Sequence, residues 1–123
     1  MTVNYYTDLK VWQRSMDLAV MIYQTVRSLP KEELYGLSDQ MRRSVVSIPS
    51  NIAEGQQRKS LKEYIHFLYV AKGSLGELET QVLLSERMGY FTALQANQIK
   101  TECTEIGKML NSLIKKLQAS SEG

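Results

Sequence analysis

The sequence has one cysteine, one histidine and two prolines among its 123 residues. A single cysteine, Cys103, cannot form an internal disulfide, which agrees with a reducing compartment. Few prolines and seven thinly spread glycines argue against disorder and against a turn-rich β-sandwich. No apolar run approaches the roughly 20 residues of a membrane span, and the N-terminus lacks a secretory apolar region. These absences predict a cytoplasmic all-α protein without a membrane segment.

Positive charge is concentrated in one part of the chain, although the net charge of +2 does not by itself indicate nucleic acid. Residues 42–62 carry five basic side chains against Glu54 alone. The five are Arg42, Arg43, Arg58, Lys59 and Lys62. One interpretation is a patch that faces phosphate groups, and the other is a solvated helix end and loop. Charge counting leaves both open.

The first helix is expected over residues 8–29. Thr7 is the expected N-cap, and Asp8 would face the positive end of the helix dipole. Pro30 ends the helix because its ring disfavours the helical conformation of the residue before it. Apolar residues recur at steps of three and four and predict the core face, with Trp12 and Tyr23 as core anchors. This seam consists of Leu9, Trp12, Met16, Ala19, Tyr23 and Val26.

The second helix is expected over residues 38–54, with Ser38 as its N-cap and Gly55 as a left-handed C-cap. Pro49 lies inside it and cannot donate a hydrogen bond to the Val45 carbonyl, so a kink is predicted there.

A narrow polar stripe follows this helix opposite its apolar side. It consists of Arg43, Ser47, Ser50 and Glu54, with Asn51 beside it. The stripe predicts a hydrogen-bonded network at a contact between helices or subunits, with Arg43 and Glu54 as charge partners. Contact with a ligand or nucleic acid is the alternative.

Two further helices are expected over residues 61–88 and 93–118. Each begins with a capping-box pattern, Ser60 with Glu63 and Thr92 with Gln95. Gly73 and Gly76 form a small-residue patch with Ala71 and Ser74, which predicts close approach of another helix to the middle of the third helix. Four amphipathic helices with short connections predict an up-down-up-down antiparallel four-helix bundle. The bundle would be a single domain over residues 1–123, with flexible ends at 1–6 and 119–123.

The candidates for chemistry are few. Glu63 and His66 have the Glu-x-x-His spacing of bundles with two metal ions, but the second such motif is missing. Cys103 lies in the apolar seam of the fourth helix and is predicted to be a core residue, not a nucleophile. The sequence has no glycine-rich phosphate loop, Ser-His-Asp set or dinucleotide fingerprint. We therefore expect no enzyme, no metal and no cofactor.

The segment around Pro49 carries a distinctive combination of residues. The combination is Gln40, Arg43, Ser47-Ile48-Pro49, Asn51-Ile52-Ala53-Glu54-Gly55, Ala71, Gly73-Ser74-Leu75 and Glu77-Leu78-Glu79. It resembles the signature of the 23S rRNA intervening-sequence proteins, a family of bacterial four-helix bundles. The similarity extends over nearly the whole chain, from Leu9 and Trp12 to Leu113 and Ile114.

The resemblance implies a small bundle that assembles as a ring, a homopentamer, with members often encoded within or near ribosomal RNA genes. Related bundles serve as accessory factors for reverse transcriptases in diversity-generating retroelements, where they bind nucleic acid and the polymerase. No catalytic residues carry over. We therefore expect a non-enzymatic oligomer that binds RNA or DNA. The alternative is a scaffold for a partner protein such as a reverse transcriptase.

Overall fold

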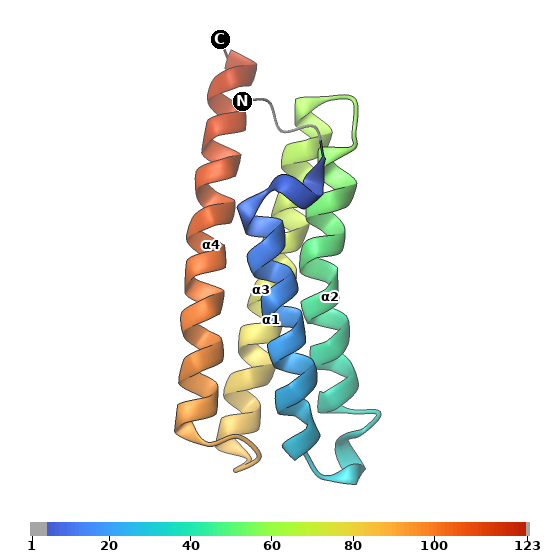
Figure 1. Cartoon of the computed structure of the whole chain (residues 1–123), viewed down its shortest axis with the longest axis vertical. Coiled ribbons are helices and arrows are strands. Elements are labelled where there is room, and N and C mark those ends of the chain that lie inside the picture. Colours follow the sequence, from blue (N-terminus) through green and yellow to red (C-terminus); the bar gives the residue numbers. More distant parts are fainter. Residues whose placement is uncertain (1–4, 123) are drawn as a thin grey trace.

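The computed structural model describes residues 5–122, which form four long α-helices and no strand (Figure 1). The helices are α1 (Lys10–Thr25), α2 (Leu37–Gln56), α3 (Leu61–Arg87) and α4 (Ala93–Glu122). Short 3-10 turns lie at η1 (Tyr6–Asp8), η2 (Val26–Ser28) and η3 (Lys31–Glu33). The predicted all-α four-helix fold is confirmed. Of the predicted flexible ends, residues 1–4 and 123 lie outside the described residues, and α4 continues past residue 118 to Glu122.

Each helix packs against two others. Along the chain, α1 contacts α2, α2 contacts α3 and α3 contacts α4, and the contact of α1 with α4 closes the bundle. Consecutive helices run in opposite directions in Figure 1. The α1–α4 contact includes an ion pair between Arg14 and Glu102, 2.9 Å apart.

Aliphatic side chains from all four helices fill the core. The largest fully buried ones are Leu18, Ile22, Met41, Val45, Ile48, Ile52, Leu68, Leu78, Val82, Ile99, Ile106 and Leu110. Burial of a side chain of this kind stabilises the fold by about 1.5–3 kcal/mol.

The core face of α1 only partly matches the predicted seam. Val26 is buried as predicted, and Leu9, Trp12 and Ala19 pack against the core from partly buried positions. The buried positions of α1 are Val11, Ser15, Leu18 and Ile22. Met16 and Tyr23, which belong to the predicted seam, are 41% and 45% exposed. Two apolar stripes run side by side on this helix, and the one with the compact aliphatic residues turns inward. The buried Ser15 hydroxyl donates to the Val11 carbonyl at 2.7 Å, which satisfies its polar group.

The predicted cap of α1 is wrong. Thr7 and Asp8 belong to η1, and Leu9 stands at the N-cap of α1 without a side-chain hydrogen bond. The 3-10 turn delays the helix start and brings Tyr6 back against Trp12. Their rings meet edge to face with centroids 5.4 Å apart.

The predicted cap of α2 is also wrong. The helix begins at Leu37 with Gly36 at the N-cap, and Ser38 is buried inside the first turn. Glu33 from η3 supplies the capping oxygen, because its carboxylate accepts the Leu37 amide at 3.1 Å. The Glu33 side chain, four residues before Leu37, therefore provides the cap that was predicted for Ser38.

Pro49 does not end α2, which continues for about two turns beyond it. Gly55 is not a left-handed cap, since the one described residue with positive φ is Gly89, at 78°. Instead, Gly55 is buried inside the helix. A Cβ placed on it would lie 2.8 Å from the Phe67 Cβ and 3.1 Å from the Tyr64 carbonyl oxygen. Gly55 therefore marks the close approach of α2 to α3.

The close approach predicted at Gly73 and Gly76 is wrong. Both glycines are exposed on the outer side of α3, and a Cβ on either would meet nothing within 4 Å. The small side chains that do face inward in this part of α3 are Ala71 and Ser74.

The predicted capping box is confirmed at the start of α4, whereas at the start of α3 only one of its two backbone hydrogen bonds forms. The Ser60 hydroxyl accepts the Glu63 amide at 3.1 Å, and the Glu63 carboxylate accepts from that hydroxyl at 3.3 Å. At α4 the exchange is reciprocal through the backbone. The Thr92 hydroxyl accepts the Gln95 amide at 3.1 Å, and the Gln95 side chain accepts the Thr92 amide at 2.9 Å.

Candidate nucleic-acid interface

The five basic residues of the predicted patch lie at two ends of α2. Arg42 and Arg43 belong to the second turn of α2. Arg58 and Lys59 lie in the loop after α2, and Lys62 belongs to the first turn of α3. At 1.5 Å per residue, the two groups are about 20 Å apart along the helix axis. The structure thus does not bring the five together.

The loop group, defined as Arg58, Lys59 and Lys62, is exposed. Arg58 pairs with Glu54 at 2.9 Å and lies over the Phe67 ring, 4.7 Å from its centroid. This cation–π contact orients the guanidinium. Lys59 and Lys62 make no ion pair with any described residue. Two unpaired cations beside an oriented third can face a phosphate backbone.

Arg42 and Arg43 are neighbours that point in different directions. Arg43 has an 81% exposed side chain and pairs with Asp39 at 2.9 Å. Arg42 is partly buried and turns back to donate a long hydrogen bond of 3.4 Å to the Leu34 carbonyl. The predicted pairing of Arg43 with Glu54 is wrong. Each of the two residues instead forms an ion pair with a residue four positions away. Arg43 pairs with Asp39, and Glu54 pairs with Arg58.

The polar stripe of α2 makes a contact between helices inside the chain. The Ser47 and Ser74 hydroxyl oxygens lie 2.7 Å apart and join α2 to α3. The Asn51 amide donates to the Ser47 carbonyl at 2.7 Å and to its hydroxyl at 2.9 Å. Arg43 and Glu54 lie outside this network. Ser74 was not predicted to belong to this network. Its place in the small-residue segment of the third helix was the feature that could have indicated it.

Cys103 is fully buried in the core. Burial raises the pKa of its thiol to about 12, and the nearby charges of Glu79 and Glu102 add to the shift. A rise from 9.0 to about 12 lowers the thiolate fraction at neutral pH about a thousandfold. Because the thiolate is the nucleophile, Cys103 is unsuited to that role.

The Glu63–His66 pair does not form a metal centre. Glu63 is engaged in the α3 cap, and the exposed His66 ring stands edge to face with Phe67 at 5.4 Å. Among the side chains of residues 5–120, no group of three or more His, Cys, Asp or Glu is placed to hold a metal ion. No helix in this range has both the length and the apolar composition needed to cross a bilayer.

Comparison with known proteins places the chain in a family. The family described as 23S rRNA-intervening sequence protein matches residues 7–112. The fold resembles a crystal structure of a protein with unknown function from the S23 ribosomal protein family of Bacteroides thetaiotaomicron VPI-5482. The TM-score is 0.79 and the identity 35%, over 85% of this chain and 95% of that one. No curated protein matches the chain. The chain therefore belongs to the 23S rRNA-intervening sequence protein family.

Proposed function

We propose that the protein is an oligomeric, non-enzymatic RNA-binding bundle that contacts the phosphate backbone through its loop group. The observation that carries the proposal is the exposure of Lys59 and Lys62 without a described carboxylate partner. The family description, which refers to 23S rRNA, favours RNA over DNA as the ligand. The basic residues near the start of α2 lie about 20 Å from the loop group along the helix axis and form a separate part of the surface.

The loop group would act through charge, not through base recognition. Each phosphate that a lysine neutralises releases condensed counterions, so binding weakens as salt rises. For a single strand the logarithm of affinity falls by about 0.7 per contact for each tenfold increase in salt. Arg58 is partly engaged with Glu54, so Lys59 and Lys62 carry most of the expected effect.

Changing Lys59 and Lys62 together to glutamine is expected to weaken RNA binding at low salt about tenfold. The salt slope should become shallower by about 1.4, because two contacts per chain are lost. Titration of labelled single-stranded RNA at several salt concentrations measures both quantities. A DNA strand of the same sequence tests the preference for RNA.

The matched control for the loop is Arg87→Gln with Lys100→Gln. It removes the same two charges near the opposite end of the bundle, where α3 ends and α4 begins. We expect its affinity and slope to stay close to those of the unchanged protein. An equal loss in the control would contradict a site in the loop, and no RNA binding at low salt by the assembled protein would contradict the function.

The proposed oligomer would form through the outer face of α1 and α2. Met16 and Val46 are exposed there, and both border a shallow groove of about 320 Å³ beside Pro49. On α1 this face includes Met16, a member of the second apolar stripe that the core of the single chain leaves 41% exposed. A second copy of the chain would remove these side chains from water.

Light scattering is expected to report several times the chain mass of 14.1 kDa, and five times that mass for the ring of five. Met16→Glu with Val46→Glu should lower the mass to that of a single chain, because charges would be buried at the contact. Leu94→Glu, at a 68% exposed position on α4, serves as the control and should leave the mass unchanged. A single chain at micromolar concentration before any substitution would contradict self-association and leave this face to a partner protein.

A further inference from the structure

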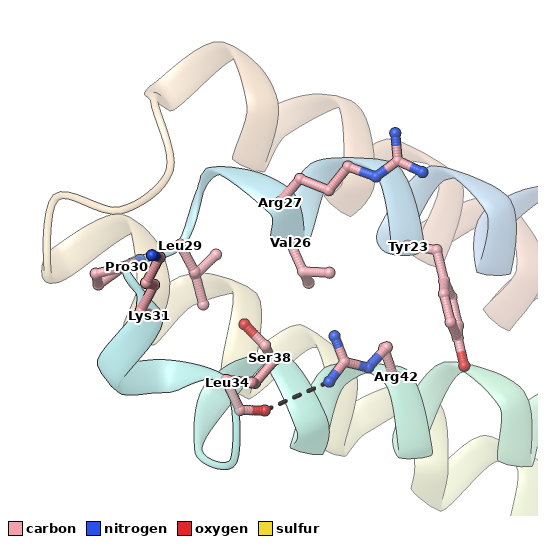
Figure 2. Close-up of a pocket in the computed structure, with 9 residues that line it drawn as sticks. All are labelled: Tyr23, Val26, Arg27, Leu29, Pro30, Lys31, Leu34, Ser38 and Arg42. Carbon is pink, nitrogen blue, oxygen red and sulfur yellow. Dashed lines mark hydrogen bonds between the residues drawn. The ribbon is translucent and has the colours of Figure 1, made fainter.

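A cavity of about 490 Å³ lies where α1 ends and α2 begins, at the opposite end of α2 from the loop group (Figure 2). Its apolar wall comes from Val26, Leu29, Pro30 and Leu34, which belong to η2, η3 and their flanks. The Tyr23 ring stands at one end of the cavity in Figure 2. Its volume falls within the range of about 300–1,000 Å³ that is common for small-molecule sites.

The Ser38 hydroxyl lines this cavity and has no partner. The residue is only 4% exposed, and its hydroxyl makes no hydrogen bond with any described residue. In Figure 2 its oxygen points from α2 toward the cavity side facing α1. Ser38 is thus a nearly buried residue whose hydroxyl opens on the cavity, where a bound group can supply its hydrogen-bond partner.

The surroundings of Ser38 favour a negatively charged partner. The Ser38 and Asp39 backbone amides have no acceptor among the described residues, and they lie at the positive end of the 20-residue helix α2. The Arg42 guanidinium points toward Ser38 in Figure 2, held there only by its 3.4 Å contact with the Leu34 carbonyl. That long contact would yield readily to a stronger acceptor.

No carboxylate competes for the cavity. None of the lining residues is acidic, whereas three of them, Arg27, Lys31 and Arg42, are basic. Arg27 and Lys31 make no ion pair with a described residue, and the Arg27 head points away from the cavity in Figure 2. The nearby Glu33 carboxylate is engaged, since it accepts from the Leu37 amide and the Tyr90 hydroxyl.

We propose that this cavity, the Arg42 pocket, binds the phosphate group of a nucleotide. The phosphate accepts from the Ser38 hydroxyl, the free amides of α2 and the Arg42 guanidinium, with Lys31 at the rim. The sugar and base lie against the apolar wall and the Tyr23 ring, where a base can stack on the aromatic face. A free nucleoside monophosphate and the 5′ end of an RNA strand both supply this chemistry.

Calorimetric titration with AMP, adenosine and inorganic phosphate tests the pocket in the full chain. We expect AMP to bind at least tenfold more tightly than adenosine and more tightly than inorganic phosphate. Arg42→Gln should weaken AMP binding at least tenfold, and Ser38→Ala about two- to tenfold, the range of one lost hydrogen bond. Arg43→Gln is the matched control, because that neighbouring side chain pairs with Asp39 and is 81% exposed. It should change the affinity less than twofold.

Three results would overturn the Arg42 pocket. They are equal affinities for AMP and adenosine, unchanged AMP binding in Arg42→Gln, and no binding of AMP or of a 5′-phosphorylated strand at millimolar concentration. Far-ultraviolet circular dichroism verifies that each variant keeps its helices, so that a loss of binding is assigned to the pocket.

A second set of ligands distinguishes the two sources of the phosphate. Tetraribonucleotides with a 5′-phosphate or a 5′-hydroxyl are compared, with AMP as competitor. Tighter binding of the phosphorylated strand, displaced by AMP, identifies an RNA end as the source. AMP binding with no difference between the strands identifies a free nucleotide. The variant with glutamine at 59 and 62 should keep its AMP affinity, so the pocket and the proposed loop contact succeed or fail separately.

Discussion

Replacing Leu18 by alanine is expected to destabilise the bundle by about 2–5 kcal/mol, because a fully buried side chain is lost and a cavity remains. Met16→Ala, two residues away, is expected to change the free energy of unfolding of the single chain by less than about 1 kcal/mol, since Met16 is 41% exposed. Urea unfolding followed by circular dichroism measures both values. The slope against urea should stay the same if only stability has changed.

The pair also tests which stripe of α1 faces the core. If Met16→Ala cost as much as Leu18→Ala at every protein concentration, the stripe through Trp12 and Tyr23 would be the core face and the described packing would be wrong. A cost at Met16 that grows with protein concentration has a different meaning. It would show that Met16 is buried between chains, because linkage to assembly makes stability depend on concentration.

Gly55→Ala is expected to destabilise the protein by about 1–3 kcal/mol, the range of overpacked core substitutions. Alanine is the better helix former by about 1 kcal/mol, so propensity alone predicts the opposite sign. The contact with α3 decides the outcome. The new Cβ would lie 2.8 Å from the Phe67 Cβ and 3.1 Å from the Tyr64 carbonyl oxygen, neither of which is a flexible side-chain end. Thermal or urea unfolding measures the change.

Gly73→Ala and Gly76→Ala are the controls for Gly55. A Cβ at either position meets nothing within 4 Å, so helix propensity acts alone and each variant should gain about 0.5–1 kcal/mol. The same substitution should therefore have opposite signs on α2 and α3. Stabilisation by Gly55→Ala would show that the two helices are not in close contact at this point.

Local signals predicted the helices and their capping boxes, because both depend on residues close in sequence. The box of Thr92 with Gln95 forms as predicted, and Ser60 caps the Glu63 amide. The start of α2 could not be predicted in this way. Its cap comes from the Glu33 side chain, which η3 places against the Leu37 amide at the start of α2.

The roles of individual faces depended on neighbours that a sequence pattern does not show. Two stripes on α1 had suitable spacing, and packing against α2 and α4 selected the aliphatic one. Glycine spacing identified small residues on α3, but Phe67 and Tyr64 decide that the close contact falls at Gly55 instead. In both cases the spacing of residues correctly predicted a helix, but it did not show which neighbouring helix packs against which face.

The charged residues illustrate the same limit for the candidate sites. Counting charge along residues 42–62 grouped cations that α2 holds about 20 Å apart. The count also missed Arg27 and Lys31, which line the same cavity as Arg42. The alternation of Arg42 and Arg43 between a cavity and solvent follows from the helical period, but identifying the cavity required the fold.

The arrangement of helix contacts determines how much of the core can form between neighbouring segments of the chain. Three of the four helix pairs join consecutive helices, so most of the core can form by closing short loops. Mean sequence separation of contacts is then low, which is typical of bundles that fold in microseconds to milliseconds. The exception is the pair of α1 with α4, where Arg14 must meet Glu102 across most of the chain. We infer that docking of these two helices is the step with the largest loss of chain entropy.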